Sequence, residues 1–582
     1  MKLNLDYYKS DIIYNKLDSE DKIIEEYINN VSEKEYPEIL KKNENIEVLY
    51  ALSETRKNII SWYPFEKNKN ILEIGAGLGE ITGELCKNAE KVISIEFSKS
   101  RGEAIAKRHF DKDNLEVIIG NLKDIKFDKK FDYITLIGIL EYAPIIFKTE
   151  NSFKDLIDFC KNLLKENGKL LIATDNKFGM RNWSTTDIDE KNLRHNSISS
   201  SKNKNTCQIF SKSKLEKMIG ENVKFYYPLP DYKFTNVIFT NDFLPDKNNI
   251  HRNMSFFYND EILSFHENDG YLQIINENKE MFEFFANSYF IEFSNNLEDN
   301  NIKYVSYWNN RKPEYRLKTI IQGNKVYKYP TNDYAIKHIE QLKNNIDIMA
   351  KSGIKTLDSY DDNRIISNYV ENFETYDKEI IKEYENNGID GATKKINEFK
   401  EKIIDKLEDS DKENNVFEKF NIECDNDLIE TMHFKKYGLW DLSFQNCFVI
   451  DDELYMYDQE WMIEKFPVEF IIYRNILIFN ELNRNLDRNE LYKILELDKY
   501  KNVFDELENK ISSSIMYEHI NKIWNRPVKN VRGLYLENNN NIGEVARKEE
   551  ELKKIAKELN NIINSKLWKA TKPIRYIVKK LK

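Results

Sequence analysis

Short apolar runs alternate with amphipathic stretches through the first third of the chain. The runs are rich in Ile, Leu and Val, and they predict five buried strands that begin near residues 71, 92, 115, 131 and 169. Helical periodicity fills intervals between them, at 79–89, 98–109 and 153–165. Strands that alternate with helices are typical of a doubly wound parallel sheet. We therefore predict a Rossmann-like α/β fold for this part of the chain.

A glycine-rich turn follows the first of these strands. The chain has 18 glycines, and four of them fall within nine residues, at Gly75, Gly77, Gly79 and Gly83. Glycine tolerates positive φ and lets a ligand approach the backbone closely. The next apolar run ends in Glu96, whose carboxylate can accept hydrogen bonds from ribose hydroxyls. This order of strand, turn, helix, strand and acid predicts a site for an adenosine-containing ligand.

The strand ends carry residues in register with such a site. Glu73 precedes the glycines, Glu96 ends the second strand, Asn121 ends the third and Gly138 ends the fourth. A glycine turn by itself is equally consistent with a tight strand–helix connection, and a NAD-binding domain is the main rival. That domain usually has the spacing GxGxxG, whereas this chain has GxGxG. The spacing favours S-adenosylmethionine as the ligand.

Residues 45–245 resemble the class I S-adenosylmethionine-dependent methyltransferases. Three phrases are similar to a subgroup found among bacterial cell-surface glycan gene products, at 52–56, 136–144 and 225–233. The resemblance implies that Glu73 and the glycines line the methionine side of the cofactor. It also implies that Glu96 holds the ribose and that Asn121 faces the adenine edge.

Methyl transfer from an activated sulfonium depends mainly on alignment, and a general base is needed only for a neutral acceptor. No residue pattern marks such a base. Glu141 lies just past the fourth strand, near the expected methyl position. An acid at the start of a helix is an equally good interpretation of Glu141, which we keep as the candidate methyl-transfer residue.

A second constellation lies in the C-terminal half, where Asp441, Asn446 and Asp458 have the D-x-x-x-x-N…D spacing of a phosphotransferase site. Asp441 would accept the proton of the acceptor hydroxyl, and Asn446 and Asp458 would bind the Mg²⁺ that accompanies ATP. Lys328, on an alternating strand upstream, would contact the phosphates. Glu340, on the following helix, is a weaker candidate as the partner of Lys328.

Residues 300–530 resemble the protein-kinase-like fold of aminoglycoside and lipopolysaccharide-core kinases, an α+β fold. Two features depart from that pattern. Leu439 stands where many members have His, and no glycine-rich loop lies between the first two strands. Both a slow kinase and a pseudokinase therefore remain open.

The last segment differs in charge from the rest of the chain. Residues 541–564 show a short heptad seam, and residues 566–582 contain seven basic residues and no acid. We expect a helical tail that contacts an anionic membrane surface, with a homo-oligomer through this helix as an open alternative. The net charge of −11 argues against nucleic acid as a partner. Five scattered cysteines without a CxxC pair suggest a cytoplasmic enzyme. The basic tail suggests that it is peripheral on the inner face of the plasma membrane.

The order of methyltransferase, kinase-like domain and tail resembles the bifunctional methyltransferase–kinases that terminate O-antigen chains. That resemblance implies phosphorylation and methylation of a glycan or lipid-linked saccharide, with glycosyltransferases as further partners. The alternatives are an O-methyltransferase of glycans or glycoproteins with a pseudokinase half, and a non-catalytic membrane-associated scaffold. The predicted segments are a helical N-terminal segment (1–60), the methyltransferase domain (61–250), a connecting segment (251–300), the kinase-like domain (301–530) and the tail (541–582).

Overall fold

The computed structural model defines most of the chain up to residue 517. The described residues are 1–9, 19–43, 45–189, 192–194, 208–247, 249–250, 262–370, 374–482, 486–517, 529–530 and 557. The predicted tail, apart from residue 557, therefore lies outside the described residues. No helix in the described part of the chain combines the length and the apolar character that crossing a bilayer requires.

Parallel strands form the first part of a large sheet, in the order β1-β4-β3-β2-β5-β6. Their bounds are β1 (Lys2–Asn4), β2 (Lys69–Ile74), β3 (Ala89–Glu96), β4 (Leu115–Ile119), β5 (Phe131–Ile137) and β6 (Leu164–Asp175). The direction of winding reverses between β2 and β5. Ligands of open α/β sheets bind at such a switch point, beyond the carboxyl ends of the strands. The glycine turn after β2 lies at this position.

Helices cover this part of the sheet and the turn at its carboxyl edge. They are α1 (Ser19–Asn30), α2 (Tyr36–Lys42), α3 (Ile46–Leu52), α4 (Asn58–Ser61), α5 (Thr82–Asn88), α6 (Lys99–Arg108), α7 (Ala143–Phe147), α8 (Ser152–Leu163), α9 (Met180–Ser184) and α11 (Lys212–Ile219). The helices before β2 share a small core with the glycine turn, because Leu49 and Leu52 pack in one cluster with Leu78 and Phe234. The N-terminal segment therefore belongs structurally to the first site.

The sheet continues past β6 with antiparallel strands. The strand β12 (Ser288–Ser294) lies between β6 and β9 (Val223–Leu229), and β10 (Val237–Thr240) follows β9. All seven residues of β12 are buried, and Glu292 within it pairs with Lys169 of β6 at 2.8 Å. The segment predicted to connect the two domains (251–300) therefore contributes a strand to the sheet. Residues 288–294 belong to the middle of the sheet.

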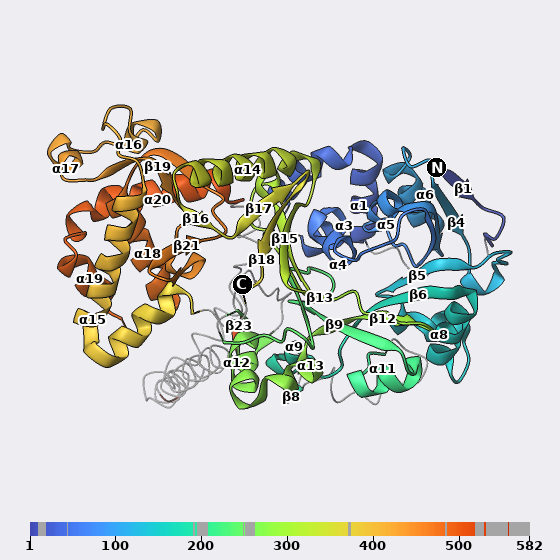
Figure 1. The fold of residues 1–582 in the computed structure, drawn as a ribbon. Coiled ribbons are helices and arrows are strands. Elements are labelled where there is room, and N and C mark those ends of the chain that lie inside the picture. The colour runs from blue at the N-terminus through green and yellow to red at the C-terminus, as the bar shows by residue number, and fades with distance from the viewer. Residues whose placement is uncertain are drawn as a thin grey trace, which may run out of the picture.

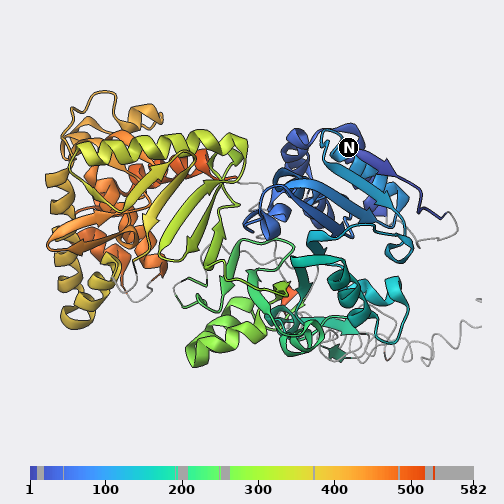
Figure 2. The same cartoon turned by 45° about the vertical axis from the view of Figure 1, so that its right-hand side comes forward.

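The same sheet extends into the second half of the chain (Figure 1). Its next strands, in the order β13-β14-β15-β18-β17, are β13 (Ile302–Tyr307), β14 (Leu317–Gln322), β15 (Lys325–Pro330), β18 (Arg364–Asn368) and β17 (Asp358–Asp361). Within the described residues, fourteen strands thus form one sheet, joined by the pairing of β10 with β13. Helix α14 (Ile336–Lys351) lies across the last of these strands, as Figure 2 shows in yellow-green.

A mainly helical lobe completes the structure, and its core is separate from that of the parallel sheet. Its short strands form two small sheets, β16-β21-β20 and β19-β22. The elements of this lobe are β16 (Lys355–Thr356), α15 (Tyr376–Lys406), α16 (Val416–Lys419), α17 (Asn426–Glu430), β19 (Phe434–Leu439), β20 (Cys447–Ile450), β21 (Glu453–Met456), β22 (Met462–Pro467), α18 (Val468–Leu482), α19 (Arg488–Ile494) and α20 (Lys501–Ile515).

The remaining elements lie below the sheet in Figure 1, near β9 and α9. They are β7 (Thr185–Asp189), β8 (Asn192–Arg194), β11 (Ile262–Leu263), α12 (Glu267–Asn278), α13 (Phe282–Phe285) and β23 (Lys529–Asn530).

Candidate functional site

The glycine turn after β2 has a backbone shape that few other residues could adopt. Gly75, Gly77 and Gly79 all have positive φ, at +74°, +58° and +80°. A Cβ on Gly75 would lie 2.0 Å from Cδ1 of Ile139, which leaves no room for a side chain. The N–H groups of Gly75 and Ala76 donate to the carbonyl oxygen of Ile95 at 2.9 and 3.1 Å, so the turn is tied to β3.

Two glycines of the glycine-rich segment make room for a side chain of the protein. A Cβ on Gly79 or Gly83 would lie 3.0 or 2.8 Å from the imidazole of His109. His109 is buried, its Nε2 lies 2.7 Å from the carbonyl oxygen of Gly79, and burial lowers its pKa to about 4. The neutral imidazole thus supports the turn from inside the fold. Gly79 therefore has a packing role against His109, and its part in lining the cofactor stays a prediction.

Glu96 lies beside the turn, as the sequence predicts. Its Oε2 accepts the N–H of Gly77 at 3.1 Å, and its Oε1 accepts the N–H of Ser98 at 2.9 Å. Burial raises the pKa of Glu96. A carboxylate can accept several hydrogen bonds, so this group can also accept from ribose hydroxyls.

Glu73 is 2% exposed and points into the interior next to the turn. Its Oε2 accepts hydrogen bonds from Oγ1 of Thr82 at 2.8 Å and from Oγ of Ser94 at 2.5 Å. Its Oε1 is buried and has no partner among the described residues. Burial raises the pKa of Glu73 to about 7. A buried oxygen without a hydrogen bond lowers the stability of the fold by about 1–3 kcal/mol. A hydrogen-bond donor on a bound ligand would therefore suit this atom.

Asn121 and Gly138 occupy the two neighbouring strand ends. Oδ1 of Asn121 accepts the N–H of Lys123 at 3.1 Å and caps a short 3₁₀ turn (Leu122–Asp124). Because one lone pair of the carbonyl is committed, its amide nitrogen is the main group left to meet a base. Gly138 has φ +70°, and a Cβ there would lie 2.7 Å from the hydroxyl oxygen of Tyr232.

Glu141 lies in a 3₁₀ turn (Leu140–Tyr142) beyond β5 and is buried. Its Oε1 accepts the hydroxyl of Thr174 at 2.6 Å, whereas its Oε2 is buried without a partner in the described part of the chain. Burial and the nearby Asp175 raise the pKa of Glu141. Glu141 therefore combines a raised pKa with a lone pair that is not used within the fold.

The sequence assigned no role to Arg56, although Arg56 lies in one of the three segments that resemble the methyltransferase subgroup, at 52–56. Its guanidinium lies 4.8 Å from the ring of Tyr50 and 5.6 Å from the ring of Tyr232, and Nη1 donates to the carbonyl oxygen of Tyr232 at 3.1 Å. Arg56 therefore links the N-terminal helices to the residue that faces Gly138. Two of the three phrases noted in the sequence meet here.

Asp231, from the same phrase as Tyr232, anchors the neighbouring backbone. It accepts the N–H groups of Lys233 and Phe234 at 2.8 and 2.9 Å, and Nη1 of Arg181 at 2.5 Å. Burial favours a higher pKa for Asp231, but Arg181 and Lys233 outweigh burial and hold its pKa below the usual value. Lys233 in turn donates to Asp175 at 2.9 Å.

The second constellation assembles around Lys328 of β15. Its Nζ pairs with Oδ1 of Asp458, and also with Oε1 of Glu460 at 2.7 Å. Asn446 Nδ2 donates to the main-chain oxygen of Asp441 at 3.0 Å, so these two predicted residues are adjacent. The structure thus brings Lys328 together with Asp458, and Asp441 together with Asn446.

Burial and the nearby Glu460 raise the pKa of Asp441 to about 7. Glu460 behaves oppositely, because Arg311 and Lys328 outweigh its burial and hold its pKa well below the usual value. In the described part of the chain, no three or more His, Cys, Asp or Glu residues gather as a preformed metal cluster.

The prediction that Glu340 pairs with Lys328 is wrong. Glu340 is exposed on α14, and the residue that this helix turns toward the site is His338. Nε2 of His338 lies 3.2 Å from Oε2 of Glu460, the acid that pairs with Lys328 instead. Glu460 is two residues after Asp458, and sequence reasoning passed over it.

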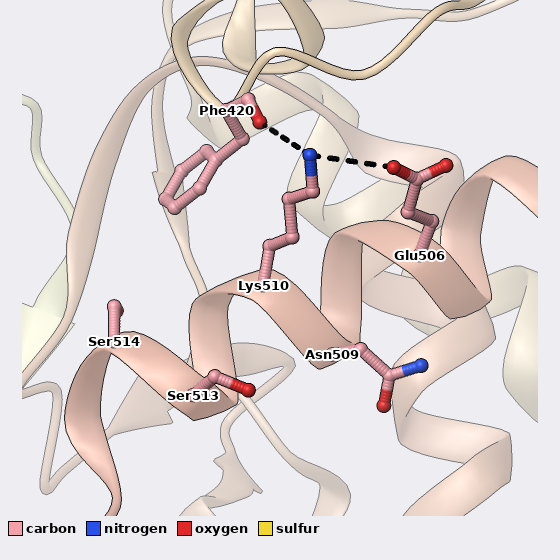
Figure 3. Close-up of a pocket in the computed structure, with 6 residues that line it drawn as sticks. All are labelled: Phe420, Glu506, Asn509, Lys510, Ser513 and Ser514. Carbon is pink, nitrogen blue, oxygen red and sulfur yellow. Dashed lines mark hydrogen bonds and ion pairs between the residues drawn. The ribbon is translucent and has the colours of Figure 1, made fainter.

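A depression on the surface of the helical lobe lies along α20 and is separate from both sets of residues. Figure 3 shows its lining, in which Lys510 donates to the carbonyl oxygen of Phe420 at 3.0 Å and pairs with Glu506 at 3.4 Å. These groups satisfy one another, and we assign no function to the depression.

The first site lies in a segment that matches a known family. Residues 72–172 match the family model described as "Methyltransferase domain". The matched segment begins in β2 and ends in β6, so it includes the glycine turn, Glu96, Asn121 and Glu141. The chain therefore contains a class I domain of the S-adenosylmethionine-dependent methyltransferases.

Similar proteins extend over only part of the chain. Ribosomal RNA small subunit methyltransferase A of Mycoplasma mycoides is 31% identical over 172 residues, which are 28% of this chain and 56% of that protein. Ubiquinone biosynthesis O-methyltransferase of Pelagibacter ubique is 34% identical over 113 residues, 19% of this chain and 44% of that protein. The chain thus spans about half the length of these curated relatives.

Among solved structures, Haemonchus contortus phosphoethanolamine N-methyltransferase 1 with phosphoethanolamine and S-adenosylhomocysteine shares 18% identity. The alignment covers 37% of this chain and 45% of that one, with a TM-score of 0.26.

Proposed function

We propose that this protein transfers a methyl group from S-adenosylmethionine to a cell-surface glycan or lipid-linked saccharide, and that its second half is a kinase-like module acting on the same acceptor. The observation that carries the proposal is the arrangement of Glu73, the glycine turn and Glu96 at the switch point of the matched domain. The cofactor, when bound, supplies an activated methyl group on a sulfonium.

The residues at the switch point fit that cofactor. The buried, unpartnered Oε1 of Glu73 suits the ammonium group of the methionine part. Glu96 suits the two ribose hydroxyls, and the amide nitrogen of Asn121 suits a ring nitrogen of adenine. The carboxylates at this site also favour a ligand that carries positive charge.

The neighbourhood of Glu141 supports a neutral acceptor. A hydroxyl acceptor needs a base, whereas a phosphate acceptor does not. Glu141 has a raised pKa and an unused Oε2, so it can take the proton from a sugar hydroxyl as the methyl group is transferred. The exposed side chain of Tyr142 follows it directly.

The kinase-like proposal has independent structural support. Lys328 lies on the third strand of the β13–β18 part of the sheet, next to Asp458, with Asp441 and Asn446 on the loop between β19 and β20. In kinases, such residues contact the phosphates, accept the hydroxyl proton and bind Mg²⁺ beside ATP. We therefore propose ATP with Mg²⁺ as the second cofactor.

One observation favours the runner-up, a methyltransferase with a pseudokinase half. The cation of Lys328 is already neutralised by Asp458 and Glu460, and Leu439 stands where a supporting His is common. In that case the second half would bind the glycan without transferring phosphate.

The acceptor is proposed from charge and resemblance. Two relatives have names that refer to ribosomal RNA and to ubiquinone biosynthesis. The net charge of −11 disfavours a polyanionic RNA acceptor. We also propose contacts with glycosyltransferases, and membrane contact or oligomerisation through residues 541–582, a segment of which the structure describes only residue 557.

The test is mass spectrometry of surface glycan from a strain that lacks the gene, complemented with defined variants. The proposal expects loss of a methyl group from the glycan in the deletion strain and its return with the wild-type chain. The variant Gly75→Ala should fail to restore the methyl group. A glycan of unchanged mass in the deletion strain would contradict the proposed acceptor.

A further inference from the structure

The segment between β13 and β14 carries a buried arginine where kinases have a glycine-rich cover. Residues 308–316 contain no glycine. Arg311 in this segment is only 6% exposed, and its guanidinium lies 4.4 Å from the ring of Trp308. A buried arginine in a connecting segment is unusual, because arginine is almost never fully buried unless it is paired.

Arg311 is paired on one side only. Its Nη1 forms an ion pair with Oε2 of Glu460. Its Nε is buried and has no hydrogen-bond partner among the described residues. The guanidinium therefore retains a buried donor without a partner, which is unfavourable when no ligand is present.

Glu460 holds two cations, one on each carboxylate oxygen. Lys328 lies on Oε1 at 2.7 Å, and Arg311 and His338 lie on Oε2. The main chain of Glu460 is fixed as well, since Nδ2 of Asn345 donates to its carbonyl oxygen at 3.0 Å. The carboxylate thus fixes Lys328 and Arg311 side by side.

The segment that carries Arg311 is also held in place by the helical lobe. The N–H of Lys312 donates to the carbonyl oxygen of Ile515 at 2.9 Å, and the N–H of Tyr517 donates to that of Asn310 at 2.7 Å. Arg311 itself forms an isolated antiparallel bridge with Met516. The segment is therefore held in a fixed position against the helical lobe, and its arginine needs little reorganisation to meet a ligand.

We propose that Arg311 and Lys328 form a two-cation cradle for the phosphates of a nucleotide, with Glu460 as the positioning residue. This inference rests on the proposed kinase-like function and goes beyond it. In kinases the backbone of the glycine-rich loop covers the phosphates, and here the planar guanidinium of Arg311 replaces that cover. Its Nε–H and a neighbouring N–H donate to two oxygens of one phosphate.

The inference is tested by nucleotide binding to the full-length chain in Mg²⁺ buffer, with a fluorescent ATP analogue displaced by ATP, ADP or adenosine. Charge-assisted hydrogen bonds contribute enough that Arg311→Gln should weaken ATP binding about tenfold or more. The loss should be smaller for ADP and under about twofold for adenosine, because only the phosphates meet the cradle. A purely structural role would weaken the binding of all three equally.

Two controls separate folding from binding. Arg364→Gln removes a half-exposed arginine of the same sheet that pairs with Asp361, and it should bind all three ligands as the wild type does. Thermal unfolding of the whole chain, together with affinity for S-adenosylhomocysteine, reports whether Arg311→Gln is folded. If that variant unfolds, Arg311→Lys keeps a charge opposite Glu460 but lacks Nε, and it should show the same dependence on phosphate number.

The outcomes distinguish this inference from the function on which it rests. If the wild type binds no ATP, the kinase-like proposal fails and the cradle fails with it. If the wild type binds ATP and both Arg311 variants bind it equally well, the kinase-like proposal stands and the cradle is wrong. An equal loss for ATP, ADP and adenosine also overturns the cradle.

Discussion

The two candidate sites of this chain differ in whether main-chain or side-chain groups form them. The first consists largely of main chain, namely the glycine turn after β2 and the N–H groups that hold Glu96. The second consists of side-chain charges, in which Lys328, Asp458, Glu460 and Arg311 neutralise one another. Backbone geometry is set by local sequence, whereas a charge cluster is set by the packing of distant elements.

The charges at the two sites also differ. At the first, the carboxylates of Glu73 and Glu141 each keep one buried oxygen without a hydrogen-bond partner among the described residues. At the second, the cations Lys328 and Arg311 share the carboxylate of Glu460, and Nε of Arg311 has no partner in the described part of the chain. We therefore expect a sulfonium to suit the first site and a phosphate to suit the second.

The largest effect is expected at the glycine turn. Gly75→Ala places a Cβ 2.0 Å from Ile139 at φ +74°, so we expect loss of S-adenosylmethionine binding by at least about 1,000-fold and a fall in stability of about 3 kcal/mol. Calorimetry and thermal unfolding measure the two quantities.

Gly323→Ala is the matched control, because Gly323 also has positive φ (+55°) but no atom lies within 4 Å of a new Cβ there. It should cost about 1–2 kcal/mol and leave binding intact. Equal effects at the two positions would contradict the assignment.

The next largest effect concerns the second site alone. Asp441→Asn should reduce acceptor-dependent ATP consumption about 1,000-fold, since it removes the proposed general base. S-adenosylmethionine affinity should not change. Asp452→Asn, at an exposed position between β20 and β21, is the control and should keep full turnover. Unchanged turnover in Asp441→Asn would support the pseudokinase alternative.

Glu73 should make the cofactor-free protein lose stability as the pH rises. Its folded pKa is about 7, above the ordinary value of 4.5, so the folded state binds the extra proton between these values. The stability that depends on protonated Glu73 is fully present below pH 4.5 and is lost as the pH rises through 7. The charge-free variant Glu73→Gln should therefore gain about 3 kcal/mol relative to the wild type between pH 4.5 and pH 8. Denaturant unfolding at these two pH values measures the gain, and parallel stability profiles would contradict it.

Glu141→Gln tests the proposed base of methyl transfer. We expect kcat for methylation to fall about 100-fold, because the amide cannot accept the acceptor proton. Binding of S-adenosylhomocysteine should remain within twofold. If kcat is unchanged, the acceptor is already ionised and a phosphate replaces the hydroxyl as the methylated group.

The smallest effect is expected at Glu340, which the sequence suggested as the partner of Lys328. Because Glu340 is exposed on α14, Glu340→Gln should change nucleotide affinity less than about twofold. Displacement of a fluorescent nucleotide measures this change. A tenfold loss would mean that the helix moves to bring Glu340 inward when nucleotide binds.

The sequence predicted the parallel part of the sheet well, because each buried strand is an apolar run of its own. β4 and β5 begin at Leu115 and Phe131, where the pattern placed them. The antiparallel β12 was missed because residues 288–294 mix aromatic and polar side chains and follow no motif. Its place between β6 and β9 depends on pairing between segments far apart in the chain.

The site residues also divide into those with a recognisable local pattern and those placed by distant contacts. Glu73, Glu96 and Gly138 could be predicted because each ends a strand of recognisable pattern. Arg311 and His338 could not, since nothing in their local sequence indicates that both would face Glu460. The role of Gly79 was also hidden, because the imidazole that fills its space comes from His109, at the end of α6.

The central claim is that the carboxyl edge of β2 and β3 binds a sulfonium nucleoside, and calorimetric titration of the full-length protein with S-adenosylmethionine tests it most directly. We predict saturable binding at one site per chain, weakened when Glu96 is replaced by Ala and unaffected by Asp441→Asn. A flat titration of the folded wild-type protein would contradict the account.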